Sequence, residues 1–126
     1  MRRLFFSVLA PIAAALALPG HALAHPKLLE SSPAADATVA KPTKLTLNFS
    51  EALVAPLSGI ELVMTAMPGM ADHPEMPIKG FATKVEGKTL TANLPRPLPA
   101  GTYVLKWHVV AADQHRIQGS YSFKVR

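Results

Sequence analysis

The sequence has 126 residues, no cysteine, and 13 basic against 8 acidic residues, which gives a formal net charge of +5. Without cysteine, disulfide-stabilised folds and thiolate metal sites are excluded, so stability must come from packing. The basic residues are scattered and do not alternate with aromatic side chains, so we expect no nucleic-acid partner.

Residues 1–24 have the pattern of a secretory signal peptide. Two arginines precede an apolar run over residues 4–18, and small residues lead to a cleavage site at Ala24. The run is shorter than the ~20 residues of a membrane span, so we expect a soluble exported protein. Cleavage would leave residues 25–126 as a single domain, lower the formal charge to +3 by removing the two arginines, and make His25 the N-terminal residue.

A histidine at the new N-terminus predicts a metal-binding terminus. The free amine and the ring nitrogen of His25 can chelate one ion together. Pro26 has no amide proton, so it cannot supply the deprotonated backbone nitrogen that many N-terminal copper peptides use. The terminus then offers two donors, and the others must come from elsewhere in the fold. The alternative interpretation is that Pro26 only shields the terminus from aminopeptidases.

Past this terminus, polar and apolar residues alternate with the period of half-buried strands. The alternation predicts strands over residues 45–50, 59–66, 89–94, 103–111 and 120–126. Three prolines between residues 95 and 99 predict a connection before the long fourth strand, on which Trp107 is the expected core anchor. With no helical periodicity outside the leader, we expect an all-β fold, an antiparallel sandwich or small Greek-key barrel.

All methionines except the initiator fall within one short segment around a histidine, namely Met64, Met67, Met70, His73 and Met76. Their spacing of three could mark one face of a helix. However, four prolines and glycines interrupt the segment, and each interior proline costs ~3 kcal/mol in a helix, so we expect an irregular loop. Thioethers are soft donors that suit Cu(I). The alternative is a gap-filling methionine cluster, and Met64 in particular could belong to the edge of the core.

The motif Asp113-Gln114-His115 follows the long predicted strand. Residues two apart in an extended segment project to the same side, so Asp113 and His115 can reach one ion. With His25 they would supply an amine, two imidazoles and a carboxylate, a tetragonal set suited to Cu(II). Glu51 is a further candidate as an axial or outer partner. The alternative is that Asp113 only forms a turn and His115 is solvated.

Together these residues resemble the periplasmic copper-resistance protein family CopC. The resemblance is carried by segments 25–28, 49–51, 63–70, 100–103, 113–115 and 119–120. It implies an Ig-like Greek-key β-sandwich or barrel of about seven strands. It also implies two copper sites, a Cu(II) site of His25, Asp113 and His115, and a methionine-rich Cu(I) loop of Met64, Met67, Met70, His73 and Met76.

The function that this resemblance implies is a monomeric periplasmic copper carrier or buffer without catalytic turnover. The expected partners are copper ions and an inner-membrane copper transporter or other periplasmic copper proteins. Two other classes stay open. A copper-dependent polysaccharide monooxygenase also uses an N-terminal histidine, although Asp113 would fill a position that oxygen chemistry needs open. An Ig-like interaction module would use the methionines as a contact surface.

Overall fold

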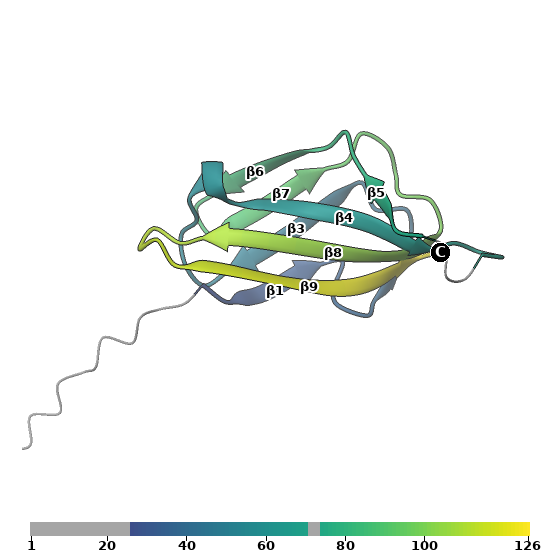
Figure 1. Ribbon diagram of the computed structural model, residues 1–126, viewed down its shortest axis with the longest axis horizontal. Helices are drawn as coiled ribbons and strands as arrows, with labels where there is room; N and C mark the ends of the chain where they lie inside the picture. The colour runs from purple at the N-terminus through teal and green to yellow at the C-terminus, as the bar shows by residue number, and fades with distance from the viewer. Residues whose placement is uncertain (1–25, 71–73) are drawn as a thin grey trace, which may run out of the picture.

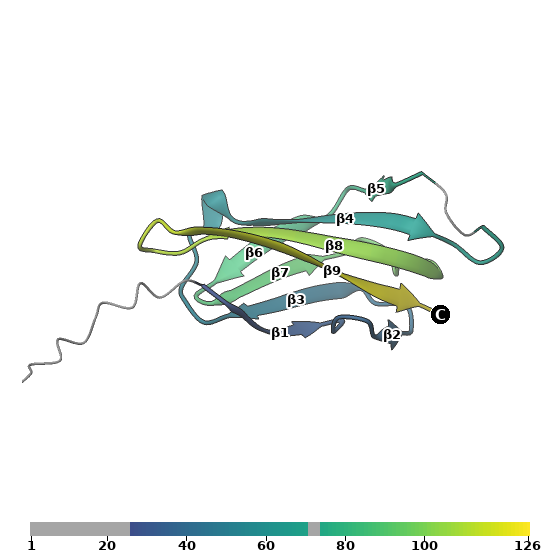
Figure 2. The same cartoon turned by 60° about the horizontal axis from the view of Figure 1, so that its bottom comes forward.

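The computed structural model describes residues 26–70 and 74–126 (Figure 1). Its elements are β1 (Leu28–Ser32), β2 (Thr38–Val39), β3 (Lys44–Phe49), η1 (Ala55–Leu57), β4 (Gly59–Ala66), β5 (Met76–Ile78), β6 (Ala82–Glu86), β7 (Thr89–Asn93), β8 (Gly101–Val110) and β9 (Arg116–Val125). They form a four-stranded sheet in the order β1-β3-β7-β6 and a five-stranded sheet in the order β2-β9-β8-β4-β5. The two sheets pack face to face (Figure 2), which confirms the predicted all-β sandwich.

The described residues contain nine strands where about seven were expected. The difference comes from β2 and β5, which have two and three residues and lie at the two edges of the five-stranded sheet. All neighbouring strands pair antiparallel except β2, which runs parallel to the end of β9.

The core lies between the sheets and is made by the inward positions of the alternating strands. Leu45, Leu47 and Phe49 of β3 are at most 2% exposed. Trp107 of β8 is half-buried and packs edge-on against Phe49, with ring centroids 5.2 Å apart. Its ring covers Gly119, where a Cβ atom would lie 2.4 Å from the indole. The predicted role of Trp107 in the core is therefore confirmed, with the neighbouring strand leaving space for the ring.

The predicted strands agree with the structure except at the last one. Residues 59–66 form β4 with the predicted bounds, whereas β9 begins at Arg116, four residues before the predicted start. The reason is a continuous ladder with β8, which pairs every residue from Gly101–Val125 to Val110–Arg116. The connection predicted by the three prolines separates β7 from β8.

The methionine segment is less irregular than predicted. Met64 lies inside β4 and Met76 begins β5, and the two residues are register partners. Between them, the backbones of Met67 and Met70 bond to each other and close a tight turn. The prolines are compatible with this arrangement because β5 is an edge strand, where a missing N–H breaks no interior ladder.

The expected signal peptide, residues 1–24, and the expected metal-binding residues His25 and His73 lie outside the described residues. Within the described ranges, no helix is long and apolar enough to cross a membrane.

Candidate metal sites

Asp113 and His115 lie in the hairpin that joins β8 to β9. The turn is closed by two backbone bonds, from Gln114 N to Ala111 O (2.8 Å) and from Ala111 N to His115 O (2.9 Å). Gln114 occupies the left-handed region, with φ of 72°. This sharp reversal between Asp113 and His115 turns both side chains toward each other. The predicted proximity of the pair is confirmed, but the predicted extended segment is wrong, because these residues form a turn.

Asp113 and His115 are joined by two hydrogen bonds. The Nδ1 atom of His115 lies 2.7 Å from Asp113 Oδ2, and the backbone N–H of His115 donates to Asp113 Oδ1 at 3.2 Å. The side-chain bond and then the backbone bond hold the pKa of the Asp113 carboxyl below its ordinary value. When the proton of the ring sits on Nδ1, the nitrogen with the available lone pair is Nε2. A carboxylate that orients an imidazole in this way is common beside metal ions.

The start of the described chain is fixed at the same end of the molecule. Pro26 is fully buried. Lys27 N donates to Ser50 Oγ, and Ser50 N donates to Lys27 O, both at 2.9 Å. Figure 1 shows the start of β1 at the end where β8 turns into β9. The residue that follows His25 is therefore anchored, although His25 itself lies outside the described residues.

A short segment after β3 connects this start to the hairpin. Ala112 N donates to Ala52 O at 3.2 Å, and Leu53 forms an isolated antiparallel bridge with Ala111. Glu51 is half-buried. It lies between Ser50, which bonds to Lys27, and Ala52, whose carbonyl accepts from Ala112 N. The segment thus brings the first described strand, Glu51 and the hairpin to one end of the sandwich. Sequence reasoning missed the tether through Ser50, because no spacing rule relates it to the terminus.

The methionines differ sharply in exposure. Met64 is 3% exposed and belongs to the core, and a Cβ atom on Gly101 would lie 3.2 Å from its Cε. Met67 is half-buried, whereas Met70 and Met76 are 55% and 49% exposed. The predicted group is therefore divided between one core residue and thioethers at the surface.

A tight turn holds two of these thioethers together. Met67 N donates to Met70 O at 3.2 Å, and Met70 N donates to Met67 O at 2.9 Å. Between them stand a proline and Gly69, whose φ of 77° suits the third position of a type II turn. The two methionines are consequently opposite each other across a closed turn.

The hairpin and the methionine turn lie at opposite ends of β8. Ala66, at the end of β4, pairs with Thr102 at the start of β8, while the hairpin follows Val110. Ten extended residues span about 30 Å, and both figures show these ends far apart. One ion cannot contact both groups. Across residues 26–70 and 74–126, no three His, Asp or Glu side chains gather as a metal site.

His108 is a histidine of the long strand β8 that is not among the predicted metal ligands. The structure places it exposed on the outer face of β8, next to Gly59 of β4. A Cβ atom on Gly59 would lie 2.9 Å from the imidazole. The missing side chain of Gly59 therefore leaves the space that the His108 ring occupies.

Comparison with known proteins gives a consistent result. Residues 28–126 match the CopC domain. Copper resistance protein C of Xanthomonas campestris pv. juglandis is 46% identical over 115 residues, which cover 91% of this chain and 90% of the relative. Copper resistance protein C of Escherichia coli is 45% identical over 106 residues, which cover 83% and 84%.

Solved structures agree. PcoC, a methionine-rich copper resistance protein from Escherichia coli, superimposes with a TM-score of 0.72 at 43% identity, covering 82% of this chain and all of the other. CopC from Methylosinus trichosporium OB3b gives a TM-score of 0.64 at 28% identity, covering 80% and 93%. The match over nearly the whole described chain and the identity to these relatives show that the chain belongs to the CopC family.

Proposed function

We propose that the protein is a periplasmic copper-binding protein of copper resistance or homeostasis, with separate sites for Cu(II) and Cu(I). The observation that carries the proposal is the segregation of donors by softness. Nitrogen and oxygen donors lie at the hairpin end, and exposed thioethers lie at the opposite end of the same sheet. The names of the relatives, copper resistance protein C, support copper as the cargo.

In the proposed Cu(II) site, His25 would supply its amine and imidazole, and Asp113 and His115 would supply the remaining donors. The contact between Asp113 and His115 already fixes the orientation of the second imidazole, so little freedom would be lost on binding. The low pKa of Asp113 keeps its carboxylate charged, as a Cu(II) donor must be. Glu51, at the same end, is placed to act as an outer partner.

In the proposed Cu(I) site, Met67, Met70 and Met76 would bind the ion together with His73. The turn that closes between Met67 and Met70 supports this set, because two soft donors flank it before any ion arrives. Met64 is instead assigned to the core beneath the site, because a side chain 3% exposed must leave its packing to bind an ion at the surface.

The protein would carry or buffer copper without turnover, as a monomer exported by cleavage after residue 24. Its exchange partners would be an inner-membrane copper transporter or other periplasmic copper proteins. A carboxylate at the hairpin supports binding over oxygen chemistry, because Asp113 would occupy a position that an oxidase must leave open.

Paired competition titrations test the two-site proposal. A chelator for Cu(II) and a chelator for Cu(I) are titrated against the mature protein and two variants. Replacing Met67, Met70 and Met76 together by Leu should abolish tight Cu(I) binding and leave Cu(II) binding intact. His115→Ala with Asp113→Asn should do the reverse. If either folded variant lost both forms of copper, the two sites would be one and the proposal would be wrong.

A further inference from the structure

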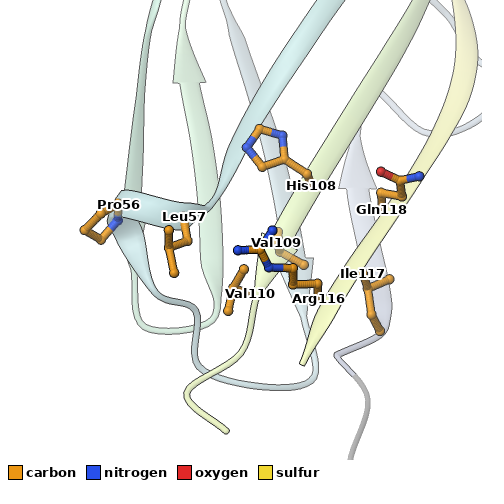
Figure 3. A pocket seen from close by; sticks show the side chains of 8 residues that line it. All are labelled: Pro56, Leu57, His108, Val109, Val110, Arg116, Ile117 and Gln118. Carbon is orange, nitrogen blue, oxygen red and sulfur yellow. The ribbon is translucent and has the colours of Figure 1, made fainter. Parts of the chain in front are cut away.

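A hollow of about 630 Å³ lies on the outer face of the five-stranded sheet, beside η1 (Figure 3). It exists because η1 is fastened over the end of β8. Val54 N donates to Val110 O at 2.8 Å, and Val110 N donates to Ser58 Oγ at 3.2 Å. The short helix therefore makes a wall, and β8 and β9 make the floor.

The hollow combines an apolar surface with a cation. Leu57 is 46% exposed, one of few large apolar side chains open to solvent in the described chain, and together with Pro56 it makes the apolar wall of the hollow. Figure 3 shows the Arg116 side chain extending from β9 across β8 toward Leu57. In the described ranges no carboxylate forms an ion pair with Arg116. A guanidinium beside apolar surface is well suited to bind a carboxylate through two parallel hydrogen bonds.

A second hollow of about 480 Å³ continues along the same two strands. It shares His108 and Gln118 with the first and adds Lys106 and Glu61. Glu61 is the one acid among its lining residues, and the Nζ atom of its register partner Lys106 also lies 3.8 Å from Glu75 Oε2, so this second hollow carries no net positive charge of its own. The two hollows thus form one track, basic at the end near η1 and lined with hydrogen-bonding groups further along.

We propose that this track docks an acidic, extended segment of a protein partner, with an apolar side chain against Leu57 and a carboxylate on Arg116. Side chains two apart on an extended peptide lie on one face at a spacing of ~7 Å, so a segment with an acidic and an apolar residue two positions apart can offer its carboxylate to Arg116 and its apolar side chain to Leu57. Charge complementarity selects an acidic partner. The track does not suit an anionic membrane, which is recognised by clusters of 4–8 basic residues, because its cations are few and spread along the strands.

The position of the track would give docking a role in copper exchange. Arg116 directly follows His115, so a segment bound there would lie beside the hairpin of the proposed Cu(II) site. This use in copper exchange rests on the proposed function, whereas the docking itself does not require copper.

The test uses the full protein, metal-free in chelator at ~0.15 M salt, and a fluorescein-labelled, acetylated eight-residue peptide in which glutamate and leucine alternate at every second position with serine between them, so that both share one face. Fluorescence anisotropy measures binding, and amide chemical shifts locate it. Arg116→Gln should weaken binding about fivefold or more. The matched control is Lys124→Gln, which removes the same charge from the same strand eight residues away. That is about 26 Å, well beyond the Debye length of ~8 Å, so its effect should stay below about twofold.

Two further arms complete the test. Leu57→Gln, a change at an exposed position, should also weaken binding of the probe. A probe with glutamine in place of glutamate should bind the parent protein more weakly. Shift changes should centre on η1 and on the adjoining ends of β8 and β9. Equal loss in Arg116→Gln and Lys124→Gln, shift changes on the four-stranded sheet, or no binding at about 1 mM peptide would overturn the proposal.

Other occupants would show themselves in the same experiment. Binding of phosphatidylglycerol vesicles without binding of the peptide would assign the face to a membrane. A dimer that Leu57→Gln abolishes would assign it to a second copy of this chain. Either result overturns the proposal. A parent protein that binds the peptide but no Cu(II) would contradict the proposed function and leave the docking surface standing.

Discussion

Met64 and Met70 offer the sharpest test of which thioethers bind Cu(I), because they are six residues apart and differ in exposure from 3% to 55%. Truncating a core methionine to alanine costs about 2–5 kcal/mol, through lost burial and the cavity left behind. Truncating an exposed methionine changes stability by at most about 0.5 kcal/mol. Met64→Ala should therefore destabilise the metal-free protein strongly, and Met70→Ala should be close to neutral.

The assay is thermal denaturation without metal, followed through the fluorescence of Trp107, which packs against the core. For a domain of about 100 residues, 1 kcal/mol corresponds to about 4–8 °C in Tm. Met64→Ala should then melt on the order of 10 °C or more below the parent, and Met70→Ala within a few degrees of it.

Leucine variants separate copper binding from packing. Met→Leu keeps the volume and removes the sulfur, and it should cost less than about 1.5 kcal/mol at either position. Met70→Leu should lose Cu(I) affinity in a competition titration, whereas Met64→Leu should retain it. An equal loss of Cu(I) affinity in both folded variants would refute the reasoning, since it would mean that Met64 leaves the core to bind the ion.

Three further predictions concern the terminus, pH and the core. Adding one residue before His25 should abolish tight Cu(II) binding in a chelator competition while circular dichroism stays unchanged; retained affinity would exclude the terminal chelate. The pKa of Asp113 is lowered in the folded state, so its contribution to stability is present above about pH 4, the unfolded value, and is lost as pH falls through the folded pKa. Asp113→Ala should thus differ from the parent in urea denaturation at pH 7 and approach it as the pH falls below the folded pKa of Asp113, whereas a constant difference would contradict that linkage. Tyr103 donates to Pro99 O at 2.6 Å, and Pro99 is exposed, so water can replace the lost donor and Tyr103→Phe should cost only about 0.5–1.5 kcal/mol in urea denaturation. Tyr121 donates at 2.8 Å to the carbonyl of Pro33, a buried residue, so Tyr121→Phe is the comparison that should cost at least as much.

The strands that alternate cleanly could be predicted, and those defined by distant contacts could not. Residues 59–66 were placed correctly because the polarity of each side chain there indicates which face of the sheet it lies on. The start of β9 was missed because Gly119 interrupts its apolar positions. The space that a side chain at Gly119 would occupy is filled by Trp107 from the neighbouring strand, and no local sequence pattern reveals that contact. The two residues of β2 form a strand only because the end of β9 lies beside them.

The candidate sites divide in the same way. The proximity of Asp113 and His115 was predicted from an extended backbone, whereas in the structure a left-handed turn brings them into direct contact. The alternation of residues 59–66 had raised the alternative that Met64 belongs to the edge of the core, and its burial bears that alternative out, but the exposure of Met70 did not follow from a spacing of three. The roles of these residues toward copper remain predictions for the titrations.

The edge strands of the two sheets determine how copies of the protein would associate when copper is bound. Each sheet edge resists the addition of a strand from another molecule. The edge strand β5 contains Pro77, and β6 carries the ion pair of Lys84 and Glu86 at 2.7 Å. At the other two edges, β2 is only two residues long and β1 is interrupted by a bulge. An ion shared between exposed thioethers of two copies could therefore hold them together only through metal bonds. With no backbone ladder to extend, such a pair would separate again when the ion is removed instead of growing into a fibre.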